Sequence, residues 1–132
     1  MRLVLLTGML SLCAGCGVDR ILSARELAAI RWTRGVASAE ERYFVARGRY
    51  CGSLDELAEE QASSFLRDGP KHSIVALRIT PSGYEASAIP DLTNASSYAM
   101  RNFYIDETSV MRYGTSSGPA GKSSPELSAF RP

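Results

Sequence analysis

Residues 114–118 of this 132-residue chain read Gly-Thr-Ser-Ser-Gly, an arrangement that matches a catalytic pattern. In a Gly-x-Ser-x-Gly motif, Ser116 would be a nucleophile between a strand and a helix, with an acid and a histidine later in the chain. The only histidine, His72, precedes Ser116, and the residues after Ser116 are rich in Gly, Ser and Pro. We therefore disfavour nucleophilic catalysis and expect that the protein is not an enzyme.

The side chains that could bind a metal ion are few and scattered. His72 has no neighbouring nitrogen or sulfur ligands in the sequence, whereas a metal site needs several that converge. Asp91, Asn94, Asp106 and Glu107 offer oxygen atoms, but calcium takes six to eight oxygen ligands. Their spacing matches no calcium-loop motif, so we interpret them as turn-forming residues. The sequence predicts no metal and no cofactor.

An apolar run occupies residues 3–12, directly after Arg2. The run is half as long as the roughly 20 residues that a membrane-spanning helix needs. It fits the basic and hydrophobic regions of a secretory signal peptide, and Ala14 and Gly15 supply small residues for cleavage. We expect residues 1–15 to be a signal peptide and the protein to be exported.

Cys16 follows those small residues, and this arrangement resembles the lipobox of bacterial lipoproteins, with Cys13 where a leucine usually stands. The resemblance implies an acylated Cys16, a lipid-anchored linker over 16–22, and a membrane-anchored lipoprotein of the periplasm or outer membrane. The alternative is cleavage nearby without acylation. In that case a disulfide between Cys16 and Cys51 becomes possible in an oxidising compartment.

The composition is that of one soluble domain, with 45% hydrophobic and 22% charged residues. Fifteen Lys and Arg against fourteen Asp and Glu give a formal charge of +1. Nucleic-acid binding needs a basic excess gathered on one face, so we expect no nucleic-acid partner. We place the domain at 23–127 and a C-terminal tail at 128–132.

The first part of this domain has the pattern of a long helix. Residues 22–47 contain no proline, and Ser23 with Glu26 has the spacing of a capping box. Gly48 fits the position after the last helical turn, and Gly35 marks either a bend or a close contact. Apolar residues recur at helical spacing at Leu27, Ile30, Val36, Ala37, Ala39, Tyr43 and Phe44.

A short helix and two β-hairpins are expected after the long helix. Ser53 and Glu56 again have capping-box spacing. A first hairpin turns through residues 81–83, and a second consists of a strand ending near Ile105, a turn at 106–109 and a strand at 110–113. On the first strand Val75, Leu77 and Ile79 alternate. The predicted fold class is α+β, with the long N-terminal helix packed on a small antiparallel sheet of two hairpins.

Aromatic side chains are expected to fill the space between helix and sheet, because each buries a large apolar area. These residues are Tyr43, Phe44, Tyr50, Tyr84, Phe103 and Tyr104. Trp32 is the exception, since it falls on a different side of the helix from Ile30. We therefore expect Trp32 to face outward and to mark a contact with a partner.

Two segments, in this order, resemble type IV pilin-like proteins, including the pseudopilins of type II secretion. The first, EERYFVARGRYCGSLDEL, resembles the end of the long pilin helix and the connecting region after it. The second, RNFYIDETSVMRY, resembles a C-terminal pilin hairpin. The matching residues are Tyr43, Phe44, Gly48, Arg49, Tyr50, Ser53, Leu54 and Leu57 in the first, and Phe103, Tyr104, Asp106, Thr108, Val110 and Arg112 in the second.

The sequence differs from the family at two places. Ser109 stands where the family has a glycine in the hairpin turn, which implies a strained residue at positive φ. The Gly-Phe processing site and the hydrophobic half-helix of pilins are not found, so the resemblance covers the headgroup. It implies a structural or interaction component of a cell-envelope assembly, held at the membrane through Cys16 and in contact with other envelope or pilin-like proteins. A small ligand-binding periplasmic lipoprotein is the main alternative, and a serine hydrolase is the second.

Overall fold

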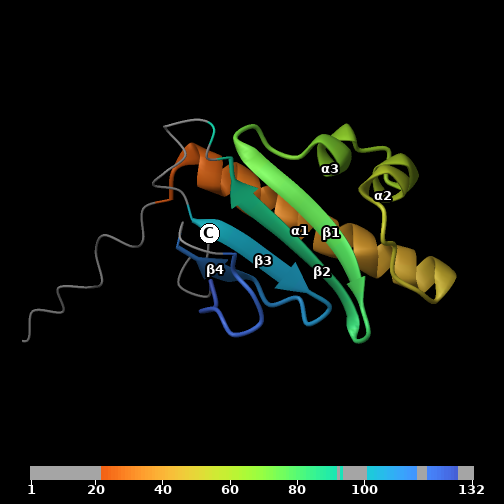
Figure 1. The fold of residues 1–132 in the computed structure, drawn as a ribbon. Helices are drawn as coiled ribbons and strands as arrows, with labels where there is room; N and C mark the ends of the chain where they lie inside the picture. The colour runs from red at the N-terminus through yellow and green to blue at the C-terminus, as the bar shows by residue number, and fades with distance from the viewer. Residues whose placement is uncertain (1–21, 92, 94–100, 116–118, 128–132) are drawn as a thin grey trace, which may run out of the picture.

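A computed structural model describes residues 22–91, 93, 101–115 and 119–127 of the chain, and helix α1 spans Ala24–Arg47 (Figure 1). Ser23 accepts a hydrogen bond from the Glu26 N–H at 3.1 Å, and the Glu26 carboxylate accepts one from the Ser23 N–H at 3.1 Å. The predicted capping box is therefore confirmed. Gly48 ends the helix with φ 72°, and its N–H donates to the Phe44 carbonyl at 2.7 Å. This left-handed conformation is the one that glycine adopts most easily.

Two short helices follow, α2 at Leu54–Glu60 and α3 at Ser64–Asp68. Ser53 is the N-cap of α2, and its hydroxyl accepts the Glu56 N–H at 3.3 Å, as expected for one half of the predicted capping box. Helix α3 was not expected from the sequence, since it has five residues and no side-chain cap. A β-carbon at Gly35 would lie 3.4 Å from a methyl group of Leu66 in α3, an ordinary van der Waals distance, so α3 packs beside this position of α1.

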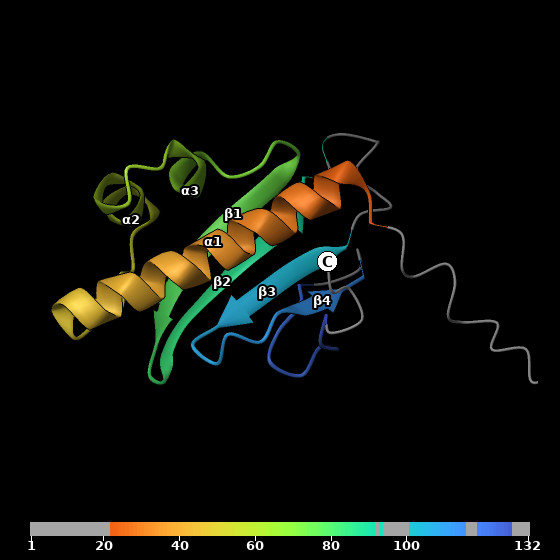
Figure 2. The ribbon, with the colours of Figure 1, turned by 180° about the vertical axis from the view of Figure 1, so that it is seen from behind.

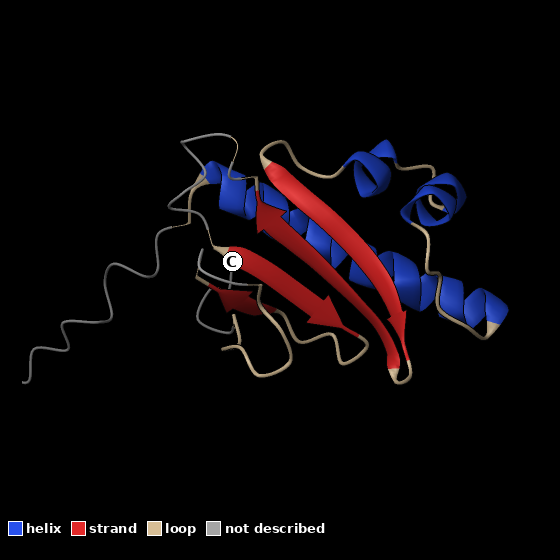
Figure 3. Cartoon of the chain, in the orientation of Figure 1, coloured by secondary structure: helices blue, strands red, loops and turns tan. Residues whose placement is uncertain are grey.

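Four strands form one antiparallel sheet in the order β1-β2-β3-β4 (Figure 3). Their bounds are Ser73–Thr80, Gly83–Pro90, Asn102–Asp106 and Arg112–Gly114. The expected strand at 110–113 therefore begins two residues late, at Arg112. The reason is that the Met111 carbonyl accepts a hydrogen bond from the Leu127 N–H instead of pairing with β3.

Helix α1 packs diagonally on one face of this sheet, while α2 and α3 lie beside it (Figure 2). Residues on β2 alternate in burial, with Tyr84, Ala86 and Ala88 buried. The two alanines leave room for the helix to approach closely. From β3, Phe103 and Ile105 complete the buried layer. The α+β class and the packing of the long helix on the sheet are thus confirmed.

The buried face of α1 differs from the predicted one at its edges. Leu27 and Phe44 were expected in the core but are 42% and 44% exposed. On β1 the expected Ile79 is 47% exposed, although Val75 and Leu77 pack against the core. The C-terminal turns of α1 extend beyond the sheet, which explains the exposure of Phe44 (Figures 1 and 2). In place of those residues, α1 buries polar side chains at Glu26, Thr33 and Glu40.

Candidate functional site

Trp32 is not a surface residue, so its expected role as a partner contact is wrong. Its side chain is fully buried, and its indole N–H donates to the Leu66 carbonyl at 3.0 Å. The physical reason is that α3 covers the flank of α1 on which Trp32 lies. Trp32 therefore fixes α3 against the long helix.

The first family-like segment forms a cluster where α1, the connecting segment and α2 meet. The buried Tyr43 hydroxyl donates to the Glu56 carboxylate at 2.7 Å. This bond raises the pKa of Tyr43 and lowers that of Glu56. The guanidinium carbons of Arg47 and Arg49 lie 5.0 and 5.4 Å from the centre of the Tyr43 ring, within range of a cation–π interaction. Leu57 is fully buried beside this cluster.

Tyr50 connects the segment after Gly48 to the sheet. Its ring centre lies 4.7 Å from that of Phe44 and 5.0 Å from that of Tyr84, in an edge-on arrangement with Tyr84. Leu54 packs against the core from the first turn of α2. These contacts give the family-like residues a structural role, since they hold the connecting segment between helix and sheet.

A buried carboxylate that the sequence analysis missed lies beneath this segment. Glu40 is fully buried, one of its oxygens accepts the Cys51 N–H at 2.8 Å, and the other has no hydrogen-bond partner. Burial raises the pKa of Glu40 to about 7. Cys51 is buried as a free thiol, and burial raises its pKa as well. A raised pKa disfavours the thiolate, so Cys51 lacks the environment of a reactive cysteine.

The second family-like segment shapes the turn between β3 and β4. Asp106 accepts hydrogen bonds from the N–H and the hydroxyl of Thr108, and the Tyr104 hydroxyl donates to the other Asp106 oxygen at 3.1 Å. Burial raises the pKa of Tyr104 to about 12. Ser109 has φ 62°, the left-handed conformation expected where the family has glycine. Asp106 therefore forms the turn, as predicted.

The same hairpin holds the C-terminal residues. Arg112 donates to the Ser124 carbonyl at 2.8 Å and lies 3.6 Å from the Glu126 carboxylate. Val110 is partly exposed at the end of the turn, and Phe103 is fully buried in the core. The contacts of Arg112 hold residues 124–126 beside β4.

The catalytic and metal-binding patterns gain no support from the described residues. Ser116 and Asn94 lie outside them, as does Cys16. The described residues that follow Ser116, 119–127, form turns and a bridge, where the nucleophile motif would require a helix. The Asp91 carboxylate accepts hydrogen bonds from the N–H and hydroxyl of Thr93. Within the described ranges, no three His, Cys, Asp or Glu side chains gather as metal ligands, and no helix is both long and apolar enough to cross a membrane.

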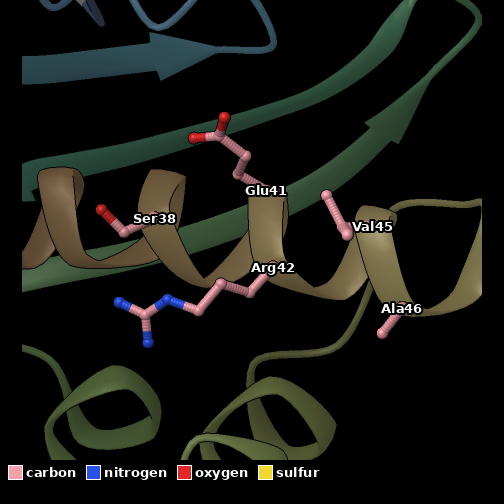
Figure 4. Close-up of a pocket in the computed structure, with 5 residues that line it drawn as sticks. All are labelled: Ser38, Glu41, Arg42, Val45 and Ala46. Carbon is pink, nitrogen blue, oxygen red and sulfur yellow. The ribbon is translucent and has the colours of Figure 1, made fainter.

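The most exposed large apolar side chain on α1 is Val45, at 82%. A hollow of about 390 Å³ on the outer face of the helix is lined by Ser38, Glu41, Arg42, Val45 and Ala46 (Figure 4). The Arg42 guanidinium donates to the Gln61 side-chain oxygen at 2.8 Å, which connects this hollow to the end of α2. We call the exposed surface formed by Leu27, Ser38, Glu41 and Val45 the outer face of α1.

Helical geometry alone could have identified this face. Val45 is two positions after the buried Tyr43, which is about 200° around the helix axis and therefore opposite the core. The hydrophobic pattern in the sequence provides only a weak signal for this face, because α1 contains both buried polar residues and exposed apolar residues. A helical face with a protruding valine and a hollow beside it can bind another helix or an apolar side chain.

Comparison of the chain with protein-family models, with curated proteins and with solved structures finds no significant match.

Proposed function

We propose that the protein is a non-enzymatic, exported pilin-like lipoprotein that acts as a structural or interaction component of a cell-envelope assembly related to type IV pili or type II secretion. The observation that carries this proposal is the outer face of α1. One side of this 24-residue helix is fixed to the sheet, while the other exposes Val45 at 82%, with a hollow beside it.

The size of α1 suits a protein–protein contact. Twenty-four helical residues extend about 36 Å, and Leu27 and Val45 lie near opposite ends of this length. A partner helix that lies along the outer face would cover both. Burial of Val45 alone would contribute about 1.5–3 kcal/mol to such a contact.

Within this proposal, residues 1–15 direct export and an acyl group on Cys16 tethers the domain to the membrane. The residues between Cys16 and the cap at Ser23 are then a short linker before a rigid helix. The family-like clusters around Tyr43 and Asp106 contribute stability to the headgroup, because their hydrogen bonds are made within the fold.

The packing of the helix on the sheet argues against the first alternative, a ligand-binding lipoprotein. Val36 from α1 and Phe103 from β3 fill the space between the helix and the sheet, and both are fully buried. A ligand pocket would need an apolar hollow there. The hydrolase alternative requires a helix after Ser116, whereas the described residues after it form turns.

The test uses the full chain expressed in its own bacterial host and extracted from membranes in mild detergent. The intact mass of the mature chain shows whether Cys16 is its acylated first residue. Size-exclusion chromatography of the extract then compares wild type with Val45→Asp and with a matched control, Ile74→Asp. Ile74 is 58% exposed on the outer side of the sheet, so neither substitution disturbs the core.

We expect the wild type and Ile74→Asp to elute as an assembly larger than the chain, and Val45→Asp to elute as the chain alone. An aspartate at the contact would be desolvated without a partner, and a loss of about 3 kcal/mol weakens binding by about 100-fold. A wild-type chain that is found alone, or an assembly that survives Val45→Asp, would refute the interaction role.

A further inference from the structure

The exposed residues along the outer side of α1 repeat with the spacing of a coiled coil. Two exposed arginines lie between the first two residues of the outer face, and the full series is Leu27, Arg31, Arg34, Ser38, Glu41 and Val45. Successive members are alternately 4 and 3 residues apart, which is the spacing of the a and d positions of a heptad. They therefore share one side of the helix, opposite the side that packs on the sheet. We call these six residues the heptad stripe.

The heptad stripe is apolar at its two ends and charged between them. Leu27 is 42% exposed at one end and Val45 is 82% exposed at the other. Arg31 and Arg34 make the half near Leu27 basic, whereas Glu41 makes the half near Val45 acidic. In the part of the chain that the structure describes, the side chains of these three charged residues form no ion pair. Their charges can therefore pair with groups on another molecule.

The heptad stripe is complementary to a second copy of itself that runs in the opposite direction. With a two-fold axis at the level of residue 36, Leu27 lies opposite the partner's Val45. In the same register Arg31 lies opposite the partner's Glu41, and Arg34 lies opposite the partner's Ser38. The symmetry makes each of these contacts occur twice. Apolar residues then meet apolar residues, and opposite charges meet each other.

Other arrangements of two α1 helices lack this match. A parallel pair in register would place Arg31 against the partner's Arg31 and Glu41 against the partner's Glu41. An antiparallel pair shifted by one heptad in either direction separates Arg31 from the partner's Glu41, and in one direction it places Arg31 opposite the partner's Arg34. Like charges that face each other across a contact weaken it. Of these arrangements, the unshifted antiparallel pair satisfies both the charges and the apolar ends.

The hollow beside Val45 has the lining that this pairing requires. Four of its lining residues, Ser38, Glu41, Arg42 and Val45, have the spacing i, i+3, i+4 and i+7, as in the holes that receive side chains in a coiled coil. Glu41 and Arg42 point in opposite directions from the helix (Figure 4), and the Arg42 guanidinium is held at the end of α2 by its 2.8 Å hydrogen bond. The partner's Arg31 would face the centre of this hollow, beside the Glu41 carboxylate.

We propose that the outer face of α1 binds a second copy of this chain, as an antiparallel helix pair about a two-fold axis. The contact extends from Leu27 to Val45, a distance of about 27 Å along the helix. The apolar ends contribute affinity, while the charged positions between them fix the direction and the register. The proposal rests on the proposed function, which assigns this face to a protein contact, and it names the partner.

Cross-linking tests the direction and register of the pair. Full-length Leu27→Cys and Val45→Cys chains are purified separately from membranes in mild detergent. Each is treated with a short bismaleimide, alone and as a mixture, and the linked peptides are identified by mass spectrometry. Identical positions lie about 27 Å apart in the antiparallel pair, beyond the reach of the reagent. We therefore expect a link between positions 27 and 45 in the mixture and no link at these positions in either variant alone. Wild type treated in the same way gives the background from the native cysteines.

Charge reversal tests the ion pairs, with the dimer dissociation constant measured by light scattering over a range of protein concentrations. Arg31→Glu places like charges opposite each other twice, so it should weaken the dimer about tenfold, and so should Glu41→Arg. The chain that carries both substitutions regains opposite charges and should return to the wild-type affinity. The matched control is Lys122→Glu, which reverses an exposed charge outside α1, at a side chain that contacts Ser82 in the β1–β2 turn. This control should leave the affinity unchanged.

A link in Leu27→Cys alone would indicate a parallel pair and would overturn the proposal. A doubly reversed chain that stays as weak as the single variants would overturn it as well. If Val45→Asp disrupts the assembly from the native host but the purified chains give no link between positions 27 and 45, the partner is a different protein. The proposed function then stands and the second copy is rejected. A wild-type chain that is alone in both preparations rejects both.

Discussion

The buried Glu40 carboxylate predicts a stability that falls as the pH rises. Its pKa is about 7 in the folded protein, against an ordinary value of 4.5. The folded state therefore binds this proton more tightly than the unfolded chain does, and the contribution of Glu40 to stability is largest below pH 4.5. The contribution is lost between pH 4.5 and pH 7. At about 1.4 kcal/mol for each pH unit, the loss amounts to about 3 kcal/mol.

The structure supplies the cause of this shift. Glu40 is fully buried, and the Cys51 N–H is its one hydrogen-bond donor, while the second oxygen has no partner. Among the residues that the structure describes, the Cys51 N–H is the group that lowers this pKa, and burial outweighs it. The pKa values of Cys51 and of Tyr84 from β2 are themselves raised by burial and by the charge of Glu40. Ionisation therefore places a charge in a poorly solvated site.

The assay is urea denaturation between pH 4 and pH 8, followed by the fluorescence of the single buried Trp32. The variant Glu40→Gln keeps an oxygen for the Cys51 N–H but cannot ionise. Relative to this variant, the wild type should lose about 3 kcal/mol of unfolding free energy across the range. The matched control is Glu41→Gln, since Glu41 is adjacent and exposed and should track the wild type at every pH.

Parallel stability curves for the wild type and Glu40→Gln would refute this reasoning. They would mean that the carboxylate is solvated, or that it has a partner with positive charge. A wild type that gains stability relative to the variant as the pH rises would be a stronger contradiction, because the sign of the pKa shift would then be reversed.

The parts of the fold that the sequence predicted are those fixed by local contacts. Ser23 and Glu26 are three residues apart, and their reciprocal hydrogen bonds define the start of α1 without help from the rest of the chain. Gly48 ends the helix for an equally local reason, its left-handed conformation. Asp106 and Thr108 form their turn within a few residues.

The parts that the sequence did not predict depend on residues far apart in the chain. From the sequence, Glu26 is expected to be a solvated residue of the helix cap, but its carboxylate also binds Arg101, 75 positions later. From the sequence, Glu40 is expected to be a surface acid, and only the fold brings the Cys51 N–H to its carboxylate. The outward prediction for Trp32 failed because α3, which covers it, is too short to leave a periodic pattern. Val45 was missed because α1 buries polar side chains and exposes apolar ones, so its sequence pattern does not separate a buried face from an exposed face.

Two further substitutions test single residues of the fold. Ser109→Gly should stabilise the protein by about 1 kcal/mol, because φ 62° is strained for serine and accessible to glycine; an unchanged urea midpoint would contradict this. Trp32→Phe should destabilise it by about 3 kcal/mol, because it leaves a cavity and removes the indole donor from the Leu66 carbonyl. Thermal unfolding followed by circular dichroism measures this loss without relying on tryptophan. A loss below about 0.5 kcal/mol is typical of a surface position, and it would mean that Trp32 faces solvent and that α3 does not cover α1.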